Sequence, residues 1–204
     1  MTARPATEPR QRNPRGHGDQ LRTDLLDAAA DLIAEHGSVD GISLRAIARR
    51  AGVSPAAVYR HFSDHTELLQ ESVRHCGNNF LGLLQAAVAD GSDAFDAFDR
   101  CGIAYADFAL RNPGHYRVMF SRKTEIEAES TIIANATFRI LVGLVEQILA
   151  DVGDGRSTLT VAVQVHTWIH GIVDLGNAHP DVEWPAAADQ LAGLRDALGL
   201  ERPN

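Results

Sequence analysis

The sequence predicts an all-α protein of about nine helices, in which a small N-terminal domain contains a helix-turn-helix and a larger helical domain follows. Two observations support this fold class. Apolar residues recur at helical spacing along most of the 204 residues, and no stretch alternates apolar and polar residues as a half-buried strand does. Serine, proline and glycine also stand where short helices are expected to begin and end. We therefore expect an arm at 1–19, domains at 20–66 and 67–200, and a tail at 201–204.

The N-terminal residues form two different segments. Residues 1–19 contain proline, glycine and four arginines but almost no bulky apolar side chain, so we expect them to form a flexible arm. From Leu21 onward, apolar residues follow the i, i+4, i+8 pattern of an amphipathic helix, which Gly37 ends. The first helix is therefore expected over residues 21–36, with one face toward a core.

Two short helices joined by a tight turn come next. Ser43 can cap a helix over 44–50, and Gly52 can end that helix in the left-handed conformation. Ser54 and Pro55 are suited to the N-cap and the first position of a second short helix, which runs to His61. This spacing is typical of a helix-turn-helix motif.

The rest of the chain contains six further helices. The first of them begins with Asp64 and Glu67 in a capping-box-like arrangement. Aromatic residues at helical spacing indicate a helix over 95–108, Asn112 and Pro113 begin a short helix that reaches 120, and an aliphatic stripe indicates a long helix over 132–148. The last two helices are expected at about 158–178 and 185–198.

Charge is distributed unevenly along the chain. The net charge is -8, which by itself argues against a nucleic-acid partner. Residues 1–75, however, hold 10 arginines and 10 acids, whereas residues 76–204 hold 9 basic residues and 17 acids. Residues 41–63 contain four arginines (Arg45, Arg49, Arg50 and Arg60) and no acid, so this local patch is compatible with binding to phosphates.

Other features restrict the location and the chemistry. The longest stretch without Asp, Glu, Lys or Arg, residues 157–173, is too polar and too short to span a bilayer. The N-terminus lacks the apolar core of a signal peptide. Cys76 and Cys101 have neither zinc-site nor disulfide-framework spacing, which indicates two reduced thiols. We expect a cytoplasmic protein with no cofactor, no bound metal and no membrane partner.

Residues 21–70 resemble the DNA-binding domain of the tetracycline repressor (TetR) family. The resemblance rests on the run Ile-Ala-Arg-Arg-Ala-Gly-Val-Ser at 47–54, on Val-Tyr-Arg-His-Phe at 58–62 and on Leu68-Leu69. Trp-Ile-His-Gly at 168–171 also resembles the Trp-x-His-Gly element of a TetR subgroup with a C-terminal domain named after it. The resemblance implies a homodimeric transcriptional repressor that binds double-stranded operator DNA and is released by a small, largely apolar ligand.

The resemblance also implies which residues contact DNA, because it places the helix over 54–61 in the major groove. Arg60 can pair with guanine or with a phosphate, whereas Ala56 and Ala57 can offer only apolar contact, for example to a thymine methyl. Tyr59 suits phosphate oxygens, but its ring could instead pack in the core of the module. His65 stands where the family usually places Lys or Arg. The implied DNA-binding residues are Ser43, Arg45, Ser54, Pro55, Ala56, Ala57, Tyr59, Arg60, His61 and His65.

The C-terminal domain is the candidate for dimerisation and ligand binding. A helix-turn-helix that reads two half-sites needs a two-fold partner, and Gly171 would let two backbones approach closely. The apolar stripes of the last two helices provide the candidate interface residues Val161, Val165, Ile172, Leu191, Leu194 and Leu198. The resemblance implies a pocket among the central helices, for which the candidate lining residues are Phe98, Tyr105, Phe108, Tyr116, Met119, Phe120, Phe138, Trp168 and His170.

An alternative function uses the polar residues of one late helix. His166, His170 and Asp174 recur every four residues, so they could hold a metal or the polar head of a ligand in a helical binding protein or metalloenzyme. A solvated or interface stripe is the favoured interpretation, because no further ligand cluster is visible. The sequence also lacks the G-x-S-x-G, H-E-x-x-H, phosphate-loop and paired-cysteine motifs. We therefore expect that the protein is not an enzyme.

Overall fold

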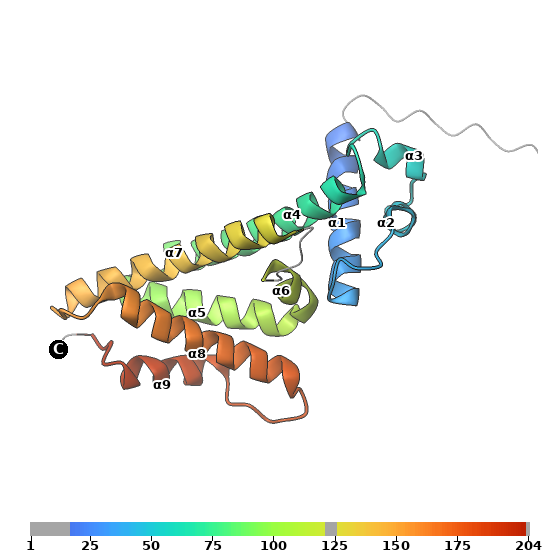
Figure 1. Cartoon of the computed structure of the whole chain (residues 1–204). Helices are drawn as coiled ribbons and strands as arrows, with labels where there is room; N and C mark the ends of the chain where they lie inside the picture. Colours follow the sequence, from blue (N-terminus) through green and yellow to red (C-terminus); the bar gives the residue numbers. More distant parts are fainter. Residues whose placement is uncertain (1–16, 121–125, 203–204) are drawn as a thin grey trace, which may run out of the picture.

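A computed structural model describes residues 17–120 and 126–202, and within these ranges every regular element is a helix (Figure 1). The predicted arm therefore lies largely outside the described residues, as do the last two residues of the tail. The all-helical prediction is confirmed for the described ranges. The helices are α1 His17–His36, α2 Leu44–Arg50, α3 Pro55–Val58, α4 His65–Ala89, α5 Ala94–Arg111, α6 Pro113–Met119, α7 Glu127–Asp151, α8 Thr158–Ala178 and α9 Ala187–Ala197.

The helices form a small module at one end of an elongated bundle. Figure 1 shows α1 crossing that end, with α2 and α3 beside it, while α4 and α7 run side by side away from the module. Helices α5, α8 and α9 pack along the other side of this pair. Helix α4 has 25 residues, which corresponds to about 37 Å of length, and it packs against α1 as well as against α5 and α7. One helix therefore belongs to both the module and the bundle.

Helix α6 makes a second connection between the two parts. It packs against α1 on one side and against α4, α5 and α7 on the other. Its contact with α1 is close because residue 114 is glycine: a Cβ atom there would lie 1.9 Å from the carbonyl oxygen of Ala34. The side chain of His115 also forms a hydrogen bond with the backbone of Ala30. The short helix α6 is thus held tightly against the module.

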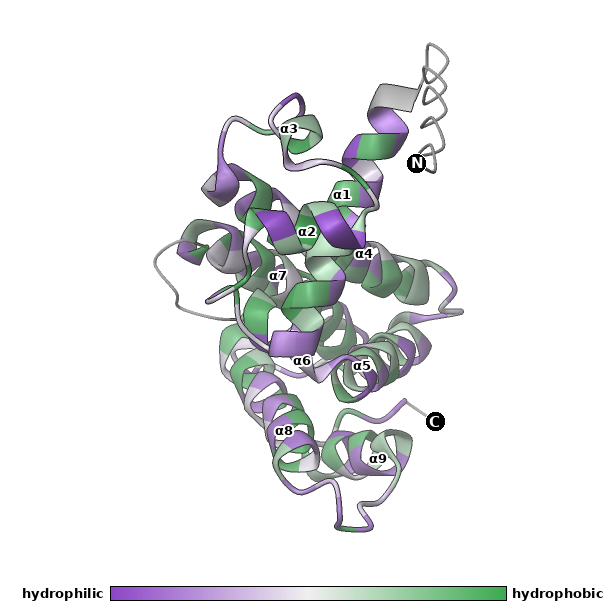
Figure 2. Ribbon diagram, turned by 90° about the vertical axis from the view of Figure 1, so that its right-hand side faces the viewer, coloured by the Kyte–Doolittle hydropathy of each residue, from purple (hydrophilic) through white to green (hydrophobic). Residues whose placement is uncertain are grey.

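A continuous hydrophobic core runs from the module through the bundle. Figure 2 shows the long helices green along part of their surface and purple along the rest, as expected of amphipathic helices around one core. Phe80 is fully buried near the middle, where its ring contacts the rings of Tyr105 and Phe108 at centroid distances of 5.2 and 4.6 Å. Aromatic packing of this kind stabilises the junction of α4 and α5.

Two predicted helices are shorter in the structure. The helix expected over 54–61 is limited to α3, Pro55–Val58, and the chain then continues in turns to Phe62. In these turns, the N–H groups of both His61 and Phe62 donate to the carbonyl oxygen of Val58, at 2.9 and 3.1 Å. The last helix, expected over 185–198, covers 187–197. Helical spacing of side chains continues through such turns, so it does not reveal where the helix ends.

Helix α7 is long and apolar enough to cross a membrane by length and composition, although it contains Arg139 and Glu146. The segment that the sequence excludes as a span is a different one, the charge-free stretch at 157–173, which lies mainly in α8. In the structure, Ile133, Leu144 and Ile148 of α7 are buried against neighbouring helices. A core helix of a soluble bundle meets the same criteria, so this finding is weak support for a span.

Candidate functional site

The helix-turn-helix is built from a turn that glycine makes possible. Gly52 has φ +70°, a conformation that favours glycine, and the N–H of Val53 then donates to the carbonyl oxygen of Ala48 at 2.9 Å. Ile47, Ala48 and Val58 are buried beneath the turn and hold α2 and α3 together. The predicted cap is also present, since the Ser43 hydroxyl accepts a bond from the N–H of Ala46 at 3.2 Å.

The outer face of α2 and α3 exposes most of the implied DNA-binding residues. Tyr59 is 59% exposed, which excludes the alternative in which its ring packs in the core of the module. Ser54 is the N-cap of α3, but its hydroxyl makes no capping bond and so remains available on the surface. Residues Ser43, Arg45, Ser54, Pro55, Ala56, Tyr59 and Arg60 are exposed, and His61 and His65 are half-buried.

One implied contact residue is wrong. Ala57 is only 6% exposed because it lies on the inner face of α3, next to the buried Val58. It therefore cannot offer its methyl group to a base without disruption of the module. The neighbouring Ala56 is exposed, so its methyl group can still contact a base. Adjacent residues of a helix lie about 100° apart around its axis, so one can be exposed while the next is buried, and this is not visible in a motif match.

The arginine patch carries less free charge than the sequence indicates. Arg50 pairs with Glu35 of α1 at 2.7 Å and lies 3.6 Å from Asp31. The hydrogen bond between Arg50 and Glu35 lowers the pKa of the carboxyl and raises the pKa of the guanidinium. Among the described residues, no acid pairs with the other members of the patch, Arg45, Arg49 and Arg60. Three arginines rather than four are therefore available for phosphates.

Helix α4 begins with the capping arrangement that the sequence predicts. The carboxylate of Asp64 accepts the N–H of Glu67 at 2.9 Å, and the carboxylate of Glu67 accepts the N–H of Ser63 at 2.5 Å. The hydrogen bonds with Ser63 lower the pKa of Glu67. Since His65 is half-buried and its Nε2 is buried with no hydrogen-bond partner among the described residues, we expect its contact with DNA to be weaker than that of an exposed lysine or arginine.

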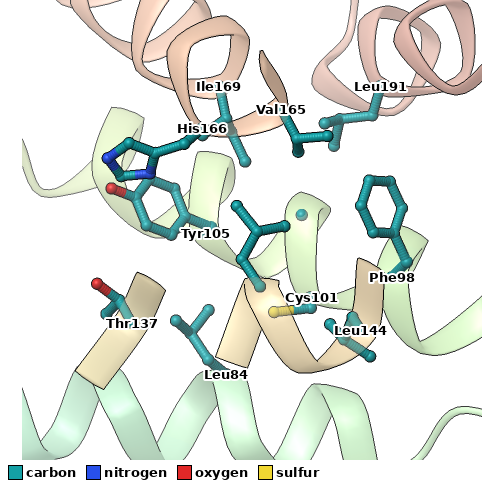
Figure 3. Close-up of a pocket in the computed structure, with 12 residues that line it drawn as sticks. Leu84, Phe98, Cys101, Tyr105, Thr137, Leu144, Val165, His166, Ile169 and Leu191 are labelled. Carbon is teal, nitrogen blue, oxygen red and sulfur yellow. The ribbon is translucent and has the colours of Figure 1, made fainter. Parts of the chain in front are cut away.

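An apolar cavity lies between α4, α5, α7, α8 and α9 (Figure 3). Its twelve lining residues include no Asp, Glu, Lys or Arg. Figure 3 shows Thr137, Tyr105 and His166 at one end of the cavity, and Phe98, Leu144 and Leu191 toward the other. The thiol of Cys101 also lines it, and burial raises the pKa of this thiol to about 11. The thiol is therefore neutral at physiological pH.

The aromatic residues predicted to line the pocket are only partly brought together. Phe98 and Tyr105 line the cavity, whereas Phe108 packs on Phe80 and Met119 is fully buried in the core. Trp168 is 46% exposed on the outer face of α8, so its assignment to the pocket is wrong. The remaining predicted residues lie beside the cavity: Tyr116, Phe120 and His170 line a separate polar groove, and Phe138 stacks edge-on against the ring of His166.

Sequence reasoning missed the aliphatic wall of the cavity. Leu84, Leu144, Val165 and Leu191 come from four different helices, and nothing in their spacing separates them from other core residues. His166 is placed by the sequence in a stripe that could hold a metal or the polar head of a ligand, and not in the predicted pocket lining. Helical spacing of aromatic residues indicates a buried face, but it does not indicate which buried side chains leave a gap between them.

One histidine of α8, His170, lies in a hydrogen-bonded network with two tyrosines. The Tyr116 hydroxyl lies 2.6 Å from Nδ1 of His170, and the Tyr105 hydroxyl lies 3.3 Å from its Nε2. A neutral imidazole satisfies both contacts by donating at one nitrogen and accepting at the other. Burial lowers the pKa of His170, and burial together with His170 lowers the pKa of His166 to about 4.

This network bears on the metal-binding alternative. Asp174 is exposed and lies in the polar groove beside His170. Across the ranges 17–120 and 126–202, no three His, Cys, Asp or Glu residues are arranged to hold a metal ion. The tyrosines occupy both nitrogens of His170, so this ring is not available as a ligand without breaking the network. The structure therefore gives the metalloenzyme alternative no support.

The predicted dimer residues face the inside of the chain. Val161, Val165, Ile172, Leu191 and Leu194 are buried within the chain, so their assignment to an interface is wrong. Leu198 is half-buried, and its assignment stays a prediction. The opposite face of α8 and the loop after it expose large apolar side chains. This outer α8 face consists of Leu159, Val163, Trp168, Leu175, Val182 and Trp184, which are six of the nine exposed large hydrophobic residues in the described chain.

These features define a class of protein: a helix-turn-helix module with an exposed basic face, joined to a helical domain that encloses an apolar cavity. The family model of bacterial regulatory proteins of the tetR family matches residues 25–72. The model of the tetracyclin repressor-like C-terminal domain matches residues 98–194. The chain therefore belongs to the TetR family. The element at 168–171 lies inside the second match, and its assignment to a subgroup stays a prediction.

Individual relatives agree with this assignment. An HTH-type transcriptional repressor of Mycobacterium tuberculosis is 37% identical over 86 residues, which cover 42% of this chain and 44% of that repressor. A solved structure of unknown function from Rhodococcus sp. RHA1 has a TM-score of 0.75 and 28% identity, and covers 91% of this chain and 96% of its own. The regulator FadR of Bacillus subtilis, solved with stearoyl-CoA, has a TM-score of 0.68 and 14% identity over 85% of this chain and 95% of its own. The first curated relatives are matched over a third to just under half of their length.

Proposed function

We propose that the protein is a DNA-binding transcriptional repressor and that the exposed face of α2 and α3 is its operator-binding surface. The observation that carries this proposal is the combination of Tyr59 and Arg60, exposed at the end of α3, with two further unpaired arginines on α2. Arginine can form two bonds to guanine or clamp a phosphate, and a tyrosine hydroxyl can donate to a phosphate oxygen. The absence of acids on residues 41–63 favours the same partner.

We propose further that the protein acts as a homodimer through the outer α8 face. Exposed apolar patches of this kind mark interaction surfaces, and operator half-sites require a two-fold partner. Leu175 and Trp168 border a groove whose floor contains Gly171. A Cβ atom on Gly171 would meet nothing within this chain, so there is space for a second backbone beside it. The family assignment is consistent with a dimer.

The cavity is proposed to bind a small-molecule effector that releases the operator. FadR, which shares the fold, was solved with stearoyl-CoA, and this supports the binding of a small molecule. The contacts of α6 offer a route from the cavity to the module. Tyr105 in the cavity wall and Tyr116 on α6 share His170, and Gly114 of α6 rests on Ala34 of α1. A ligand releases DNA only if it binds the DNA-free arrangement more tightly.

The test is a binding titration by fluorescence anisotropy, with DNA from the promoter of the protein's own gene, over a series of salt concentrations. Simultaneous Tyr59→Ala and Arg60→Ala changes are expected to weaken binding more than tenfold, since base or phosphate contacts contribute about 1–3 kcal/mol each. The salt dependence should also become shallower as phosphate contacts are lost. Arg111→Ala, at an exposed arginine of α5, is the matched control. Unchanged binding by the double variant would refute the proposed surface.

A further inference from the structure

The effector cavity is chemically selective, because every side chain that lines it is uncharged at physiological pH. The twelve lining residues include no acid, lysine or arginine, and the neighbouring Arg195 and Asp99 pair with each other at 2.5 Å. A carboxylate or ammonium group placed in such a cavity would lose its hydration without gaining a partner of opposite charge, which is strongly unfavourable. The lining therefore selects against charged ligands.

The polar atoms of the cavity are mostly occupied by other partners. Thr137 donates its hydroxyl to the carbonyl oxygens of Ile133 and Ala134, at 3.1 and 2.9 Å. The Tyr105 hydroxyl is engaged with His170. His166 is different: its ring packs against the rings of Phe138 and His170, but among the described residues no group forms a hydrogen bond with it. His166 is thus the polar side chain with unused bonding capacity at this end of the cavity.

From these observations, and resting on the effector function proposed above, we infer that the ligand is an uncharged, mainly hydrocarbon molecule with one hydrogen-bonding group, and that His166 binds this group. The apolar body of the ligand would extend toward Phe98 and Leu191 at the far end (Figure 3). Alcohols, phenols, ketones, esters and lactones belong to this class.

The protonation state of His166 fits an uncharged ligand. With its pKa lowered to about 4 by burial and by the adjacent His170, the ring is neutral at pH 7. A neutral imidazole has one N–H donor and one acceptor, so it can bind a hydroxyl or a carbonyl, but it offers no positive charge to compensate a buried carboxylate. The edge-on contacts with Phe138 at 5.1 Å and His170 at 4.3 Å hold the ring in one orientation. Such preorganisation favours specific binding.

The inference can be tested with two matched probe series on the full-length protein. The linear series is 1-octanol, octanoate and octylamine, and the aromatic series is 2-naphthylmethanol, 2-naphthoate and 2-naphthylmethylamine. Within a series only the head group differs, so ligand-dependent thermal stabilisation compares the head groups directly. In at least one series we expect the alcohol to bind more than tenfold tighter than both charged analogues. Charged analogues that bind equally well or better, or an absence of binding in both series, would overturn the inference.

A His166→Phe variant tests the role of the imidazole. It keeps an aromatic ring but removes the hydrogen bond, so alcohol affinity should fall roughly three- to tenfold. His166→Gln, which retains a donor and an acceptor, should restore most of the affinity and also covers the case in which the Phe variant folds poorly. His179→Phe makes the same replacement at an exposed histidine beyond α8 and should bind the alcohol as the wild type does. Equal alcohol affinity of the Phe variant and the wild type would refute the role of His166.

A third measurement locates the probe and separates the two proposals. In a Cys76→Ala background, bound alcohol should slow labelling of the cavity thiol Cys101 by a maleimide; unchanged labelling would show that the alcohol binds elsewhere and would overturn the inference. Operator binding is measured in parallel without probe. A protein that binds its operator but ignores the alcohols retains the regulatory function and loses this inference. A protein that binds the alcohols but no DNA retains this inference about the ligand and contradicts the proposed regulatory function.

Discussion

The contact between α6 and the DNA-binding module can be tested by adding one carbon atom to residue 114. In Gly114→Ala, the new Cβ would lie 1.9 Å from the carbonyl oxygen of Ala34 and 2.7 Å from its Cα. Non-bonded carbon and oxygen atoms do not approach closer than about 3 Å, so α6 and α1 would have to separate by at least about 1 Å. The clash involves backbone atoms of two helices, and therefore no side-chain rotation can relieve it.

We expect this separation to cost about 1–3 kcal/mol of unfolding free energy, the range typical of overpacking, even after the higher helix propensity of alanine is included. For a chain of this length the melting temperature would fall by roughly 3–10 °C. Operator affinity should change as well, because α6 positions α1. Gly82→Ala is the matched control: a Cβ atom there meets nothing within 4 Å, so the variant should be as stable as the wild type or slightly more stable.

The assay combines urea unfolding, followed by far-UV circular dichroism, with operator binding by anisotropy. An unchanged m-value in Gly114→Ala would show that the difference arises from stability and not from a change in the amount of surface exposed on unfolding. If Gly114→Ala and Gly82→Ala unfold at the same urea concentration, the proposed close contact between α6 and α1 does not limit stability, and the coupling route through α6 loses its basis.

Three further predictions concern the bundle. Because the pKa of His166 is lowered from 6.5 to about 4, the unfolded chain binds more protons, so the wild type should lose stability as the pH falls from 6.5 to 4. After discounting for partial exposure, the contribution of His166 to this loss is about 1–2 kcal/mol, and the loss should be smaller by that amount in His166→Phe when both proteins are unfolded in urea at each pH. Tyr116→Phe removes the bond to Nδ1 of His170 and should lower the unfolding free energy by about 1 kcal/mol; no loss in urea melts would argue against the network. Leu175→Asp should yield monomers in analytical ultracentrifugation, whereas Ile132→Asp, at an exposed residue of α7, should not; dimers in both cases would exclude the outer α8 face.

The module was predictable because its local sequence determines its backbone. The left-handed Gly52, the caps at Ser43 and Asp64 and the proline that begins α3 each act within a few residues, so they can be recognised without knowledge of the fold. The Arg50–Glu35 pair could not be foreseen in the same way. It joins residues 15 positions apart whose approach depends on how α2 crosses α1.

The bundle was predictable only as a set of amphipathic helices. Helix α8 has apolar residues on two faces, and sequence spacing alone does not show which face packs within the chain. Val165 and Ile172 prove to be core residues, while Leu175 and Val163 remain at the surface. The cavity depends on small mismatches among five helices, and such mismatches arise from three-dimensional packing that no single helix encodes.

The shared helix α4 limits how this protein could be divided into exchangeable parts. The boundary expected at 66/67 falls in the first turn of α4, and Leu68, Leu69 and Val73 just beyond it are buried in the core that includes α1. A fragment that ends at residue 66 would leave the apolar face of α1 uncovered and prone to aggregation. A chimera that combines this module with another sensor should therefore be joined at the far end of α4, near residue 89, so that each module retains the helix that completes its core.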